Sequence, residues 1–282
     1  MNPALHVDLD GAWPRDAARG AEYLDARSWG PRLRFSAPRA EMERFYDEVT
    51  AKLAPFTLYG SGEFHHLSAL WLRQFHDPIV LVSFDNHPDW DVRPPHWGCG
   101  GWVNRALALL HVQFASVWGC GNFEFNWPHQ MFGNRRAVAD GRLTAHVWKE
   151  RMNEKVRARW PVISRGDWRE KFMAFAAKLG GRKVYVTMDT DCLCGEDAVT
   201  NWEQGLFTAE DVAWALGDLR TSGAQIIGGD ICGAWSPPEY ARWKQKFAAN
   251  FDRPKLGVID PAKAREVNER SLAILWPALL GA

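Results

Sequence analysis

The chain has 282 residues, of which 46% are apolar, and its 34 lysines and arginines balance 34 aspartates and glutamates. This apolar fraction is ordinary for a globular protein and excludes wholesale disorder. The formal net charge of zero provides no basic surface for nucleic acid or for an anionic membrane. No apolar run approaches the length of about 18 residues that would span a bilayer, and the charged N-terminal stretch does not resemble a signal peptide.

The five cysteines are odd in number, and no two of them have the Cys-x-x-Cys spacing. They therefore predict neither a disulfide scaffold nor a zinc ribbon, and they favour a reducing compartment. We expect a cytoplasmic protein that acts on a small molecule and binds neither nucleic acid nor membrane.

Short apolar runs that end in turn residues predict strands, in chain order at residues 5–8, 56–60, 79–84, 114–119, 184–188 and 225–228. Several of these runs are apolar throughout, which is typical of strands that are buried on both faces of a parallel sheet. Strands that alternate with helices over the whole length predict an α/β fold with a covered, parallel sheet. We find no repeat and no linker, and we expect one domain over residues 1–282.

Helical spacing of apolar residues occurs between these runs. Asp167 with Glu170, and Thr208 with Asp211, have the spacing of capping boxes that begin helices. A last amphipathic stretch runs from about residue 262 to the C-terminus. Most of the 16 tryptophans are expected to pack in the core or at its rim.

Polar side chains follow three of the predicted strands. Asp85, His87 and Asp89 alternate after one strand, and Asp189 with Asp191 follows another. Alternate residues of an extended segment point to the same side, and ligands bind beyond the carboxyl ends of parallel strands. A third strand is followed by a glycine-rich turn and the pair His65-His66.

Together these groups bring several carboxylates and imidazoles to one edge of the sheet. The sequence places no matching cluster of lysines or arginines beside them. Because so many like charges repel one another, a bound divalent cation is the natural compensation. A mixed set of oxygen and nitrogen ligands suits Mn²⁺ or Zn²⁺.

The motifs resemble those of the ureohydrolases, the arginase and agmatinase family. Asp85–Asp89 resembles the family's Asp-Ala-His-x-Asp, and Thr187–Leu193 resembles its Ser-x-Asp-x-Asp-x-Leu motif. Gly205–Thr208 resembles the Gly-Gly-Leu-Thr that follows, and Gly62–Leu67 is similar to Gly-Gly-Asp-His-Ser-Leu with one residue inserted. The resemblance covers residues 56 to 237. It implies a three-layer α/β/α fold of the arginase/deacetylase type, with a mainly parallel sheet of about eight strands.

The resemblance also implies two Mn²⁺ ions per chain, with Zn²⁺ as the alternative. One ion would be held by His65, Asp85, Asp89 and Asp189, and the other by Asp85, His87, Asp189 and Asp191. His65 is preferred to His66 as the ligand, because the following residues then align with the family's Ser-Leu. The family analogy also implies a homo-oligomer.

Two dications about 3.5 Å apart ionise a bridging water, and the hydroxide attacks an sp² carbon of the substrate. This predicts hydrolysis of a non-peptide C–N bond in an amide, an amidine or a modified guanidine. Asp191 is the candidate for relaying the proton to the leaving amine.

Three departures from the family pattern bear on the substrate. Asp230 is kept, but Gly233 occupies the position of the family's glutamate that accepts the guanidinium, which argues against arginase or agmatinase activity. Asn104 lies nearest the position of the family's proton-shuttle histidine, and His66 and His96 are the candidate replacements. In the third departure, Cys194-Gly195 replaces the family's Asp-Pro, so the loop that follows is expected to have its own shape.

Asp230, Asn104 and Glu124, which follows the strand at 114–119, are the candidate substrate contacts. Two alternatives stay open at this point. One is a single-zinc, deacetylase-like enzyme of the same fold, and the other is a non-catalytic metal-binding protein that has lost its substrate machinery.

Overall fold

A computed structural model describes residues 2–94 and 97–281. Within the described residues, nine strands form one sheet in the order β2-β1-β3-β9-β8-β4-β5-β6-β7, and all neighbouring strands are parallel. The strands are β1 (Ala4–Asp8), β2 (Glu22–Asp25), β3 (Phe56–Tyr59), β4 (Ile79–Phe84), β5 (Val112–Cys120), β6 (Leu143–Trp148), β7 (Val162–Ile163), β8 (Lys183–Asp189) and β9 (Gln225–Cys232).

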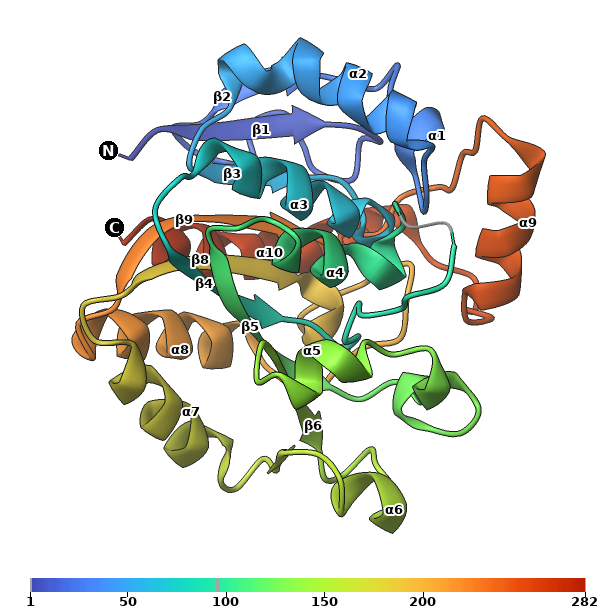
Figure 1. The fold of residues 1–282 in the computed structure, drawn as a ribbon. Coiled ribbons are helices and arrows are strands. Elements are labelled where there is room, and N and C mark those ends of the chain that lie inside the picture. The colour runs from blue at the N-terminus through green and yellow to red at the C-terminus, as the bar shows by residue number, and fades with distance from the viewer. Residues whose placement is uncertain (1, 95–96, 282) are drawn as a thin grey trace.

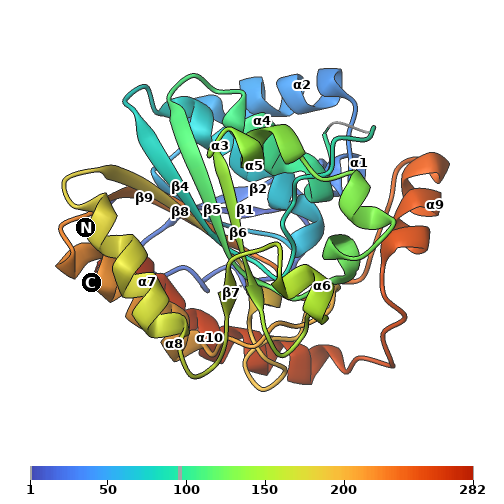
Figure 2. The ribbon, with the colours of Figure 1, turned by 60° about the horizontal axis from the view of Figure 1, so that its bottom comes forward.

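Helices cover both faces of this sheet (Figures 1 and 2). They are α1 (Gly30–Leu33), α2 (Arg39–Val49), α3 (Ser68–Trp71), α4 (Trp102–Leu107), α5 (Arg135–Ala139), α6 (Glu154–Arg157), α7 (Trp168–Ala176), α8 (Ala209–Thr221), α9 (Trp243–Asp252) and α10 (Pro261–Leu280). The expected three-layer α/β/α architecture with a parallel sheet is confirmed, and the sheet has one strand more than the eight expected.

Two hydrophobic cores lie on the two sides of the sheet. On one side α2, α3 and α4 contribute buried aromatic residues such as Phe45, Trp71 and Trp102. On the other side α7, α8 and α10 contribute Phe172, Leu216 and similar residues. Because the central strands are covered on both faces, all six residues of β4 are buried, which explains its uninterrupted apolar sequence.

The strands that the sequence did not predict are β2, β6 and β7. They lie at or near the edges of the sheet, where one face or one side meets solvent. In β2 every residue is partly or fully exposed, and β7 has only two residues. Such short strands have no continuous apolar run, and their pairing depends on neighbours that are distant in sequence.

The predicted helix starts have different outcomes. The capping box of α8 is present, because Thr208 Oγ1 accepts a hydrogen bond from the Asp211 N–H at 3.1 Å and the Asp211 carboxylate accepts one from the Thr208 N–H at 3.1 Å. The box predicted at Asp167 is wrong. Although α7 begins at the next residue, the Asp167 carboxylate accepts hydrogen bonds from the Ser164 N–H and hydroxyl instead.

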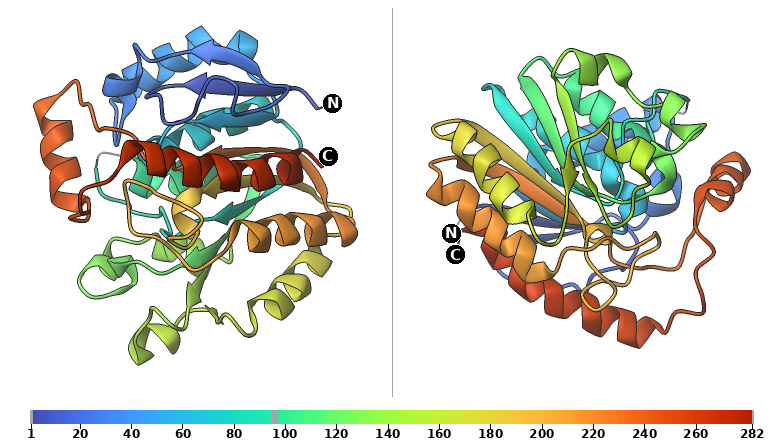
Figure 3. Two further views of the ribbon diagram at one scale, coloured as in Figure 1. Left: turned by 180° about the vertical axis from the view of Figure 1, so that it is seen from behind. Right: turned by 90° about the horizontal axis from the view of Figure 1, so that it is seen from below.

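The last helix, α10, crosses the sheet next to α8 and brings the two ends of the chain together (Figure 3). Asn2 Nδ2 donates a hydrogen bond to the carbonyl oxygen of Leu280 at 3.0 Å. None of the helices in the described ranges combines the length and the apolarity that a membrane crossing requires.

Helix α9 stands away from both layers, beyond the carboxyl ends of the strands (Figure 1). It is attached through a small cluster in which Ala249 packs with Phe35, Cys99 and Trp202. This attachment carries Asp252, the last residue of α9, to the edge of the sheet where the predicted site lies.

The covered sheet generates a prediction about stability. Leu81 lies in the centre of β4 and is fully buried, whereas Leu110 is fully exposed. We expect Leu81→Ala to lower the free energy of unfolding by about 2–5 kcal/mol, because it leaves a cavity in a close-packed core. The matched control Leu110→Ala should change it by less than about 0.5 kcal/mol. Urea denaturation followed by circular dichroism measures both, and equal values would contradict this burial pattern.

Candidate metal centre

Strand register brings the predicted ligands to one place. In the pairing of β4 with β8, Phe84 lies opposite Met188, so that Asp85 and Asp189 leave neighbouring strands at the same level. His65 reaches this point from β3, through the short 3₁₀ helix Gly62–Leu67 that follows that strand. The carboxyl ends of parallel strands meet at one edge of the sheet, and three sequence segments therefore converge there.

Two clusters of ligand atoms result, and they share Asp85. In the first, His65 Nδ1 lies 3.1 Å from Asp85 Oδ2, 3.3 Å from Asp89 Oδ2 and 3.7 Å from Asp189 Oδ2. In the second, His87 Nδ1 lies 2.7 Å from Asp191 Oδ2 and 3.6 Å from Asp85 Oδ1. Asp85 thus turns one carboxylate oxygen toward each cluster. All six side chains belong to buried residues.

Asp89 reaches the first cluster through an unusual backbone conformation. Its φ is 47°, in the left-handed region, which costs a residue other than glycine about 1–3 kcal/mol. The carboxylate accepts a hydrogen bond from the indole N–H of Trp102 at 2.6 Å. The Trp102 hydrogen bond thus holds the side chain of a residue whose backbone is strained, and such strain is typical of functional positions.

The carboxylates perturb one another strongly. Burial and the charge of Asp85 raise the pKa of Asp89 to about 7, and burial likewise raises the pKa of Asp189 to about 6. Burial and the charge of Asp189 also raise the pKa of Asp191 well above its usual range. Burial acts on Asp85 in the same direction, but the interactions of its carboxylate with His65 and His87 outweigh it and lower its pKa. The charge on each carboxylate therefore depends on its neighbours in the cluster.

Several buried atoms of the cluster have no hydrogen-bond partner: His65 Nδ1, Asp85 Oδ2 and Asp191 Oδ2. An unpaired buried polar atom costs about 1–3 kcal/mol, and more when it is charged. These atoms belong to groups of three side chains whose ligand atoms lie within 4.8 Å of one another. Carboxylate oxygens and neutral imidazoles in this arrangement fit divalent cations.

The orientation of the His65 ring is set by contacts of its second nitrogen, Nε2, on the side away from the carboxylates. His65 Nε2 lies 2.8 Å from Thr187 Oγ1, and the Thr187 hydroxyl donates to Asp230 Oδ1 at 2.6 Å. Because the Thr187 proton is engaged with Asp230, its oxygen accepts the Nε2 proton of His65. This tautomer leaves the Nδ1 lone pair of His65 facing the carboxylates.

Asp230 itself lies in the core and does not line the cavity. Its carboxylate accepts hydrogen bonds from the hydroxyls of Tyr59, Ser68, Thr187 and Tyr185, and the residue has no exposed surface. The structure therefore places this predicted substrate contact out of reach of a substrate, and its contacts are those of a group that supports His65.

The remaining predicted residues lie in different surroundings. His66 is fully buried and does not line the cavity, and burial lowers its pKa to about 3. The Asn104 side chain donates hydrogen bonds to the backbone oxygens of Trp90 and Asp91 and accepts one from Asn134. It does not line the cavity. Glu124 lines the cavity. His96 lies outside the described residues.

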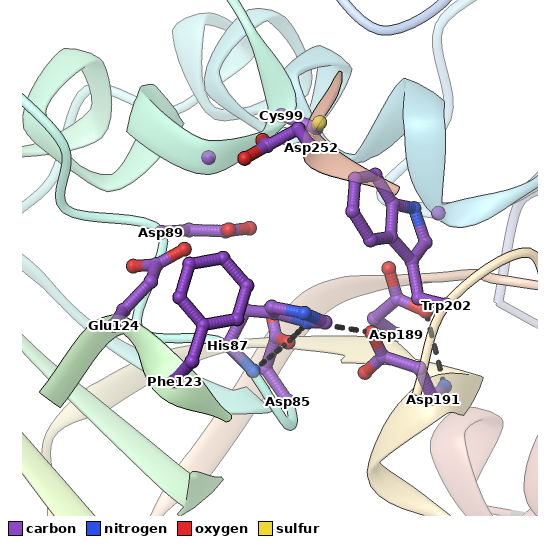
Figure 4. Close-up of a pocket in the computed structure, with 12 residues that line it drawn as sticks. Asp85, His87, Asp89, Cys99, Phe123, Glu124, Asp189, Asp191, Trp202 and Asp252 are labelled. Atoms are coloured by element: carbon purple, nitrogen blue, oxygen red, sulfur yellow. Dashed lines mark hydrogen bonds and ion pairs between the residues drawn. The ribbon is translucent and has the colours of Figure 1, made fainter. Parts of the chain in front are cut away.

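A narrow cavity lies directly above the two clusters and is lined by five of the candidate ligands, Asp85, His87, Asp89, Asp189 and Asp191. Figure 4 shows Glu124, Asp252, Phe123 and Trp202 around it, with the metal-binding candidates at its floor. Burial raises the pKa values of both Glu124 and Asp252. Within the described residues, no lysine or arginine lines this cavity.

The sequence analysis missed several of these residues. Asp252 and Trp202 reach the cavity from segments that carry no recognisable motif. Glu203 contacts His87 at 3.5 Å. Cys232 lies beside Asp189, with Sγ 3.8 Å from Oδ2, and only the register of β8 with β9 places it there.

Gly233, which the sequence resemblance aligns with the family's guanidinium-binding glutamate, follows β9. Its φ is 116°, and a Cβ atom there would lie 2.3 Å from Asp189 Oδ1 and 2.5 Å from the backbone nitrogen of Thr190. Here the backbone itself approaches the cluster. A side chain cannot be added at this position without moving Asp189.

Solved structures with a similar fold are hydrolases of the ureohydrolase family. Proclavaminate amidino hydrolase from Streptomyces clavuligerus has a TM-score of 0.54 and 13% identity, over 99% of this chain and 92% of that one. Formimidoylglutamase from Bacillus subtilis has a TM-score of 0.58 and 15% identity, over 99% and 86%. Arginase from Medicago truncatula has a TM-score of 0.55 and 13% identity, over 99% and 86%. The arginase-like fold that the resemblance implied is thus confirmed, and the low identity is that of a divergent chain.

An uncharacterized protein of Thermotoga maritima is 29% identical over 196 residues. These residues make up 69% of this chain and 64% of that protein, so the match covers less than two thirds of the relative. No protein-family model matches the sequence.

The backbone at Gly233 generates a prediction. We expect Gly233→Ala to destabilise the protein by more than about 1–3 kcal/mol, because a left-handed conformation alone costs that much in a residue with a Cβ atom. Gly217→Ala is the matched control. Gly217 lies inside α8 with no atom within 4 Å of an added Cβ, and alanine there should stabilise by about 0.5–1 kcal/mol. Thermal unfolding of both variants checks this, and a neutral Gly233→Ala would contradict the close approach.

Proposed function

We propose that this protein is a metal-dependent hydrolase that cleaves a C–N bond other than a peptide bond. The observation that carries the proposal is the position of Asp85, whose two oxygens face two separate clusters of buried ligands. These clusters lie at the carboxyl ends of the central strands of an arginase-like fold. Two cations, with Asp85 between them, account for both clusters.

In this proposal one cation is held by His65, Asp85, Asp89 and Asp189, and the other by Asp85, His87, Asp189 and Asp191. The oxygen-rich set favours Mn²⁺ among the candidate metals. When bound, such a cation pair lowers the pKa of water and stabilises negative charge that develops on the substrate. The protein's own part is to hold the ligands rigidly and to exclude bulk water from the floor of the cavity.

Asp191 is the proposed proton carrier. Its Oδ1 accepts the N–H of Asn86 at 3.1 Å, which fixes the plane of the carboxylate. Its Oδ2 has no hydrogen-bond donor and belongs to a residue that lines the cavity. A carboxylate in this position can accept a proton and pass it to a leaving amine. His66, which does not reach the cavity, has no part in this proposal.

The substrate we propose is an amidine, an amide or a modified guanidine rather than free arginine. Proteins of this fold include an amidino hydrolase and a formimidoylglutamase, whose names denote groups with a carbon–nitrogen bond at an sp² carbon. Gly233 offers no carboxylate to a guanidinium. Glu124 and Asp252 face the cavity instead, and we propose that they bind a positively charged part of the substrate.

The first prediction concerns metal content. After dialysis against Mn²⁺, we expect close to two ions per chain by elemental analysis. Asp85→Ala and Asp189→Ala should lose both ions, because the proposed assignment gives each of these carboxylates to both ions. Asp140→Ala is the control, since Asp140 is exposed at the end of α5 and pairs only with Arg136 among the described residues.

Other outcomes of this measurement have clear meanings. One tightly held Zn²⁺ per chain would favour the single-zinc, deacetylase-like enzyme. Two ions without hydrolysis of any amide or amidine would favour the non-catalytic metal-binding protein. A folded wild-type protein that binds no metal would refute the proposed function.

The second prediction concerns Glu124. Glu124→Gln should raise KM for a cationic substrate by about 10- to 100-fold with little change in kcat, because a hydrogen bond to a charged group contributes about 1.5–3 kcal/mol. A neutral substrate of the same shape should be affected much less. Steady-state kinetics on both substrates provide the measurement, with the exposed Glu48→Gln on α2 as control. An equal effect on both substrates would contradict the charge-recognition role.

A further inference from the structure

The imidazole of His87 has a second contact that the ligand clusters do not explain. Its Nδ1 faces Asp191 and Asp85, whereas its Nε2 points out of the cluster toward Glu203, with 3.5 Å between Nε2 and Oε2. Both of these atoms are buried, and neither has a hydrogen-bond partner elsewhere in the described structure. The two unpaired atoms thus face each other.

The loop that carries Glu203 is fastened to the same part of the site. Asn86 Nδ2 donates to the backbone oxygen of Glu203 at 3.1 Å, and the ring of Trp202 packs edge-on against His87 with 5.4 Å between the ring centres. The Gly205 N–H donates to the carbonyl oxygen of Asp191 at 2.6 Å. Glu203 is therefore held beside His87 by its own backbone, by Trp202 before it and by Gly205 two residues after it.

We propose that Glu203 is a positioning residue that holds the Nε2–H of His87 and so presents the Nδ1 lone pair to a metal ion. The assignment rests on the proposed function, because it gives His87 the role of a ligand. Metal-binding histidines generally donate their second N–H to a carboxylate or carbonyl, and this contact fixes the tautomer and the ring orientation. His65 is held in the corresponding way by Thr187 and Asp230.

The position of Glu203 supports this role over that of an ordinary surface carboxylate. The side chain is 39% exposed overall, but the exposed part is not Oε2, which is buried. Glu196 on the same loop is exposed and provides a carboxylate of equal chemistry without the contact to His87.

The test compares Glu203→Ala, Glu203→Gln and the control Glu196→Ala in the full-length protein. Mn²⁺ is titrated into each metal-free protein, and the free ion is followed by electron paramagnetic resonance. We expect Glu203→Ala to weaken one of the two Mn²⁺ sites by about 10- to 100-fold and to leave the other unchanged. Glu203→Gln should recover most of the affinity, because its amide oxygen also accepts a hydrogen bond from Nε2.

A second readout separates positioning from a general loss of structure. In the protein loaded with Zn²⁺, the ¹H–¹⁵N spectrum of the imidazoles should show a protected Nε2 proton on His87 in the wild type and in Glu203→Gln. The same proton should exchange rapidly in Glu203→Ala. The thermal unfolding midpoints of the three metal-free variants should stay close to that of the wild type.

The outcomes distinguish this inference from the proposed function. If the wild type binds two Mn²⁺ and Glu203→Ala binds both equally well, the positioning role is wrong and the proposed function stands. A Glu203→Gln variant as weak as Glu203→Ala would also overturn the role of hydrogen-bond acceptor. If the wild type binds no Mn²⁺, the proposed function fails and the assignment of Glu203 fails with it.

Discussion

Mutual repulsion among buried carboxylates is the constraint on which the site depends. Asp85, Asp89, Asp189 and Asp191 lie together at the ends of two neighbouring strands. Among the described residues, the groups of opposite charge that contact these carboxylates are the imidazoles of His65 and His87. Burial of an ionised carboxylate without a partner is expensive enough that the group takes up a proton instead. In the proposed function, divalent cations remove this conflict, and the surrounding residues hold the oxygens that would bind them.

The support for the two histidines is built differently on the two sides of the site. On one side the Nε2–H of His65 donates a hydrogen bond to Thr187, and the Thr187 hydroxyl donates one to Asp230 within a buried network of hydroxyls. On the other side His87 depends on a single carboxylate from a loop that departs from the ureohydrolase pattern. The first arrangement is sealed in the core, whereas the second forms part of the cavity wall. A difference in metal affinity between the two sites is the expected physical consequence.

In the proposed function, the choice of substrate depends on Gly233 and on the acidic residues of the cavity. Because the backbone approaches Asp189 at Gly233, a carboxylate side chain cannot be added there without moving Asp189. The acidic groups that do face the cavity, Glu124 and Asp252, come from β5's outgoing loop and from α9. The fold is therefore that of the ureohydrolases, while the means of recognising a substrate belong to this chain.

The sequence by itself determined the parallel α/β fold and the metal-ligand candidates, because both depend on local patterns. Uninterrupted apolar runs indicate strands buried on both faces, and alternating aspartates and histidines after β4 and β8 indicate ligands that share a side. Short edge strands such as β2 and β7 were not predictable, since they have no continuous apolar run and form only by pairing with strands that are distant in sequence. The sequence already preferred His65 to His66, and the structure places His65 beside Asp85 and Asp89. Only the tertiary structure decided that Asp230 supports His65 from the core and that Glu203 and Asp252 reach the site. These positions depend on strand register and on loops that fold back over long sequence distances, and neither leaves a local pattern in the sequence.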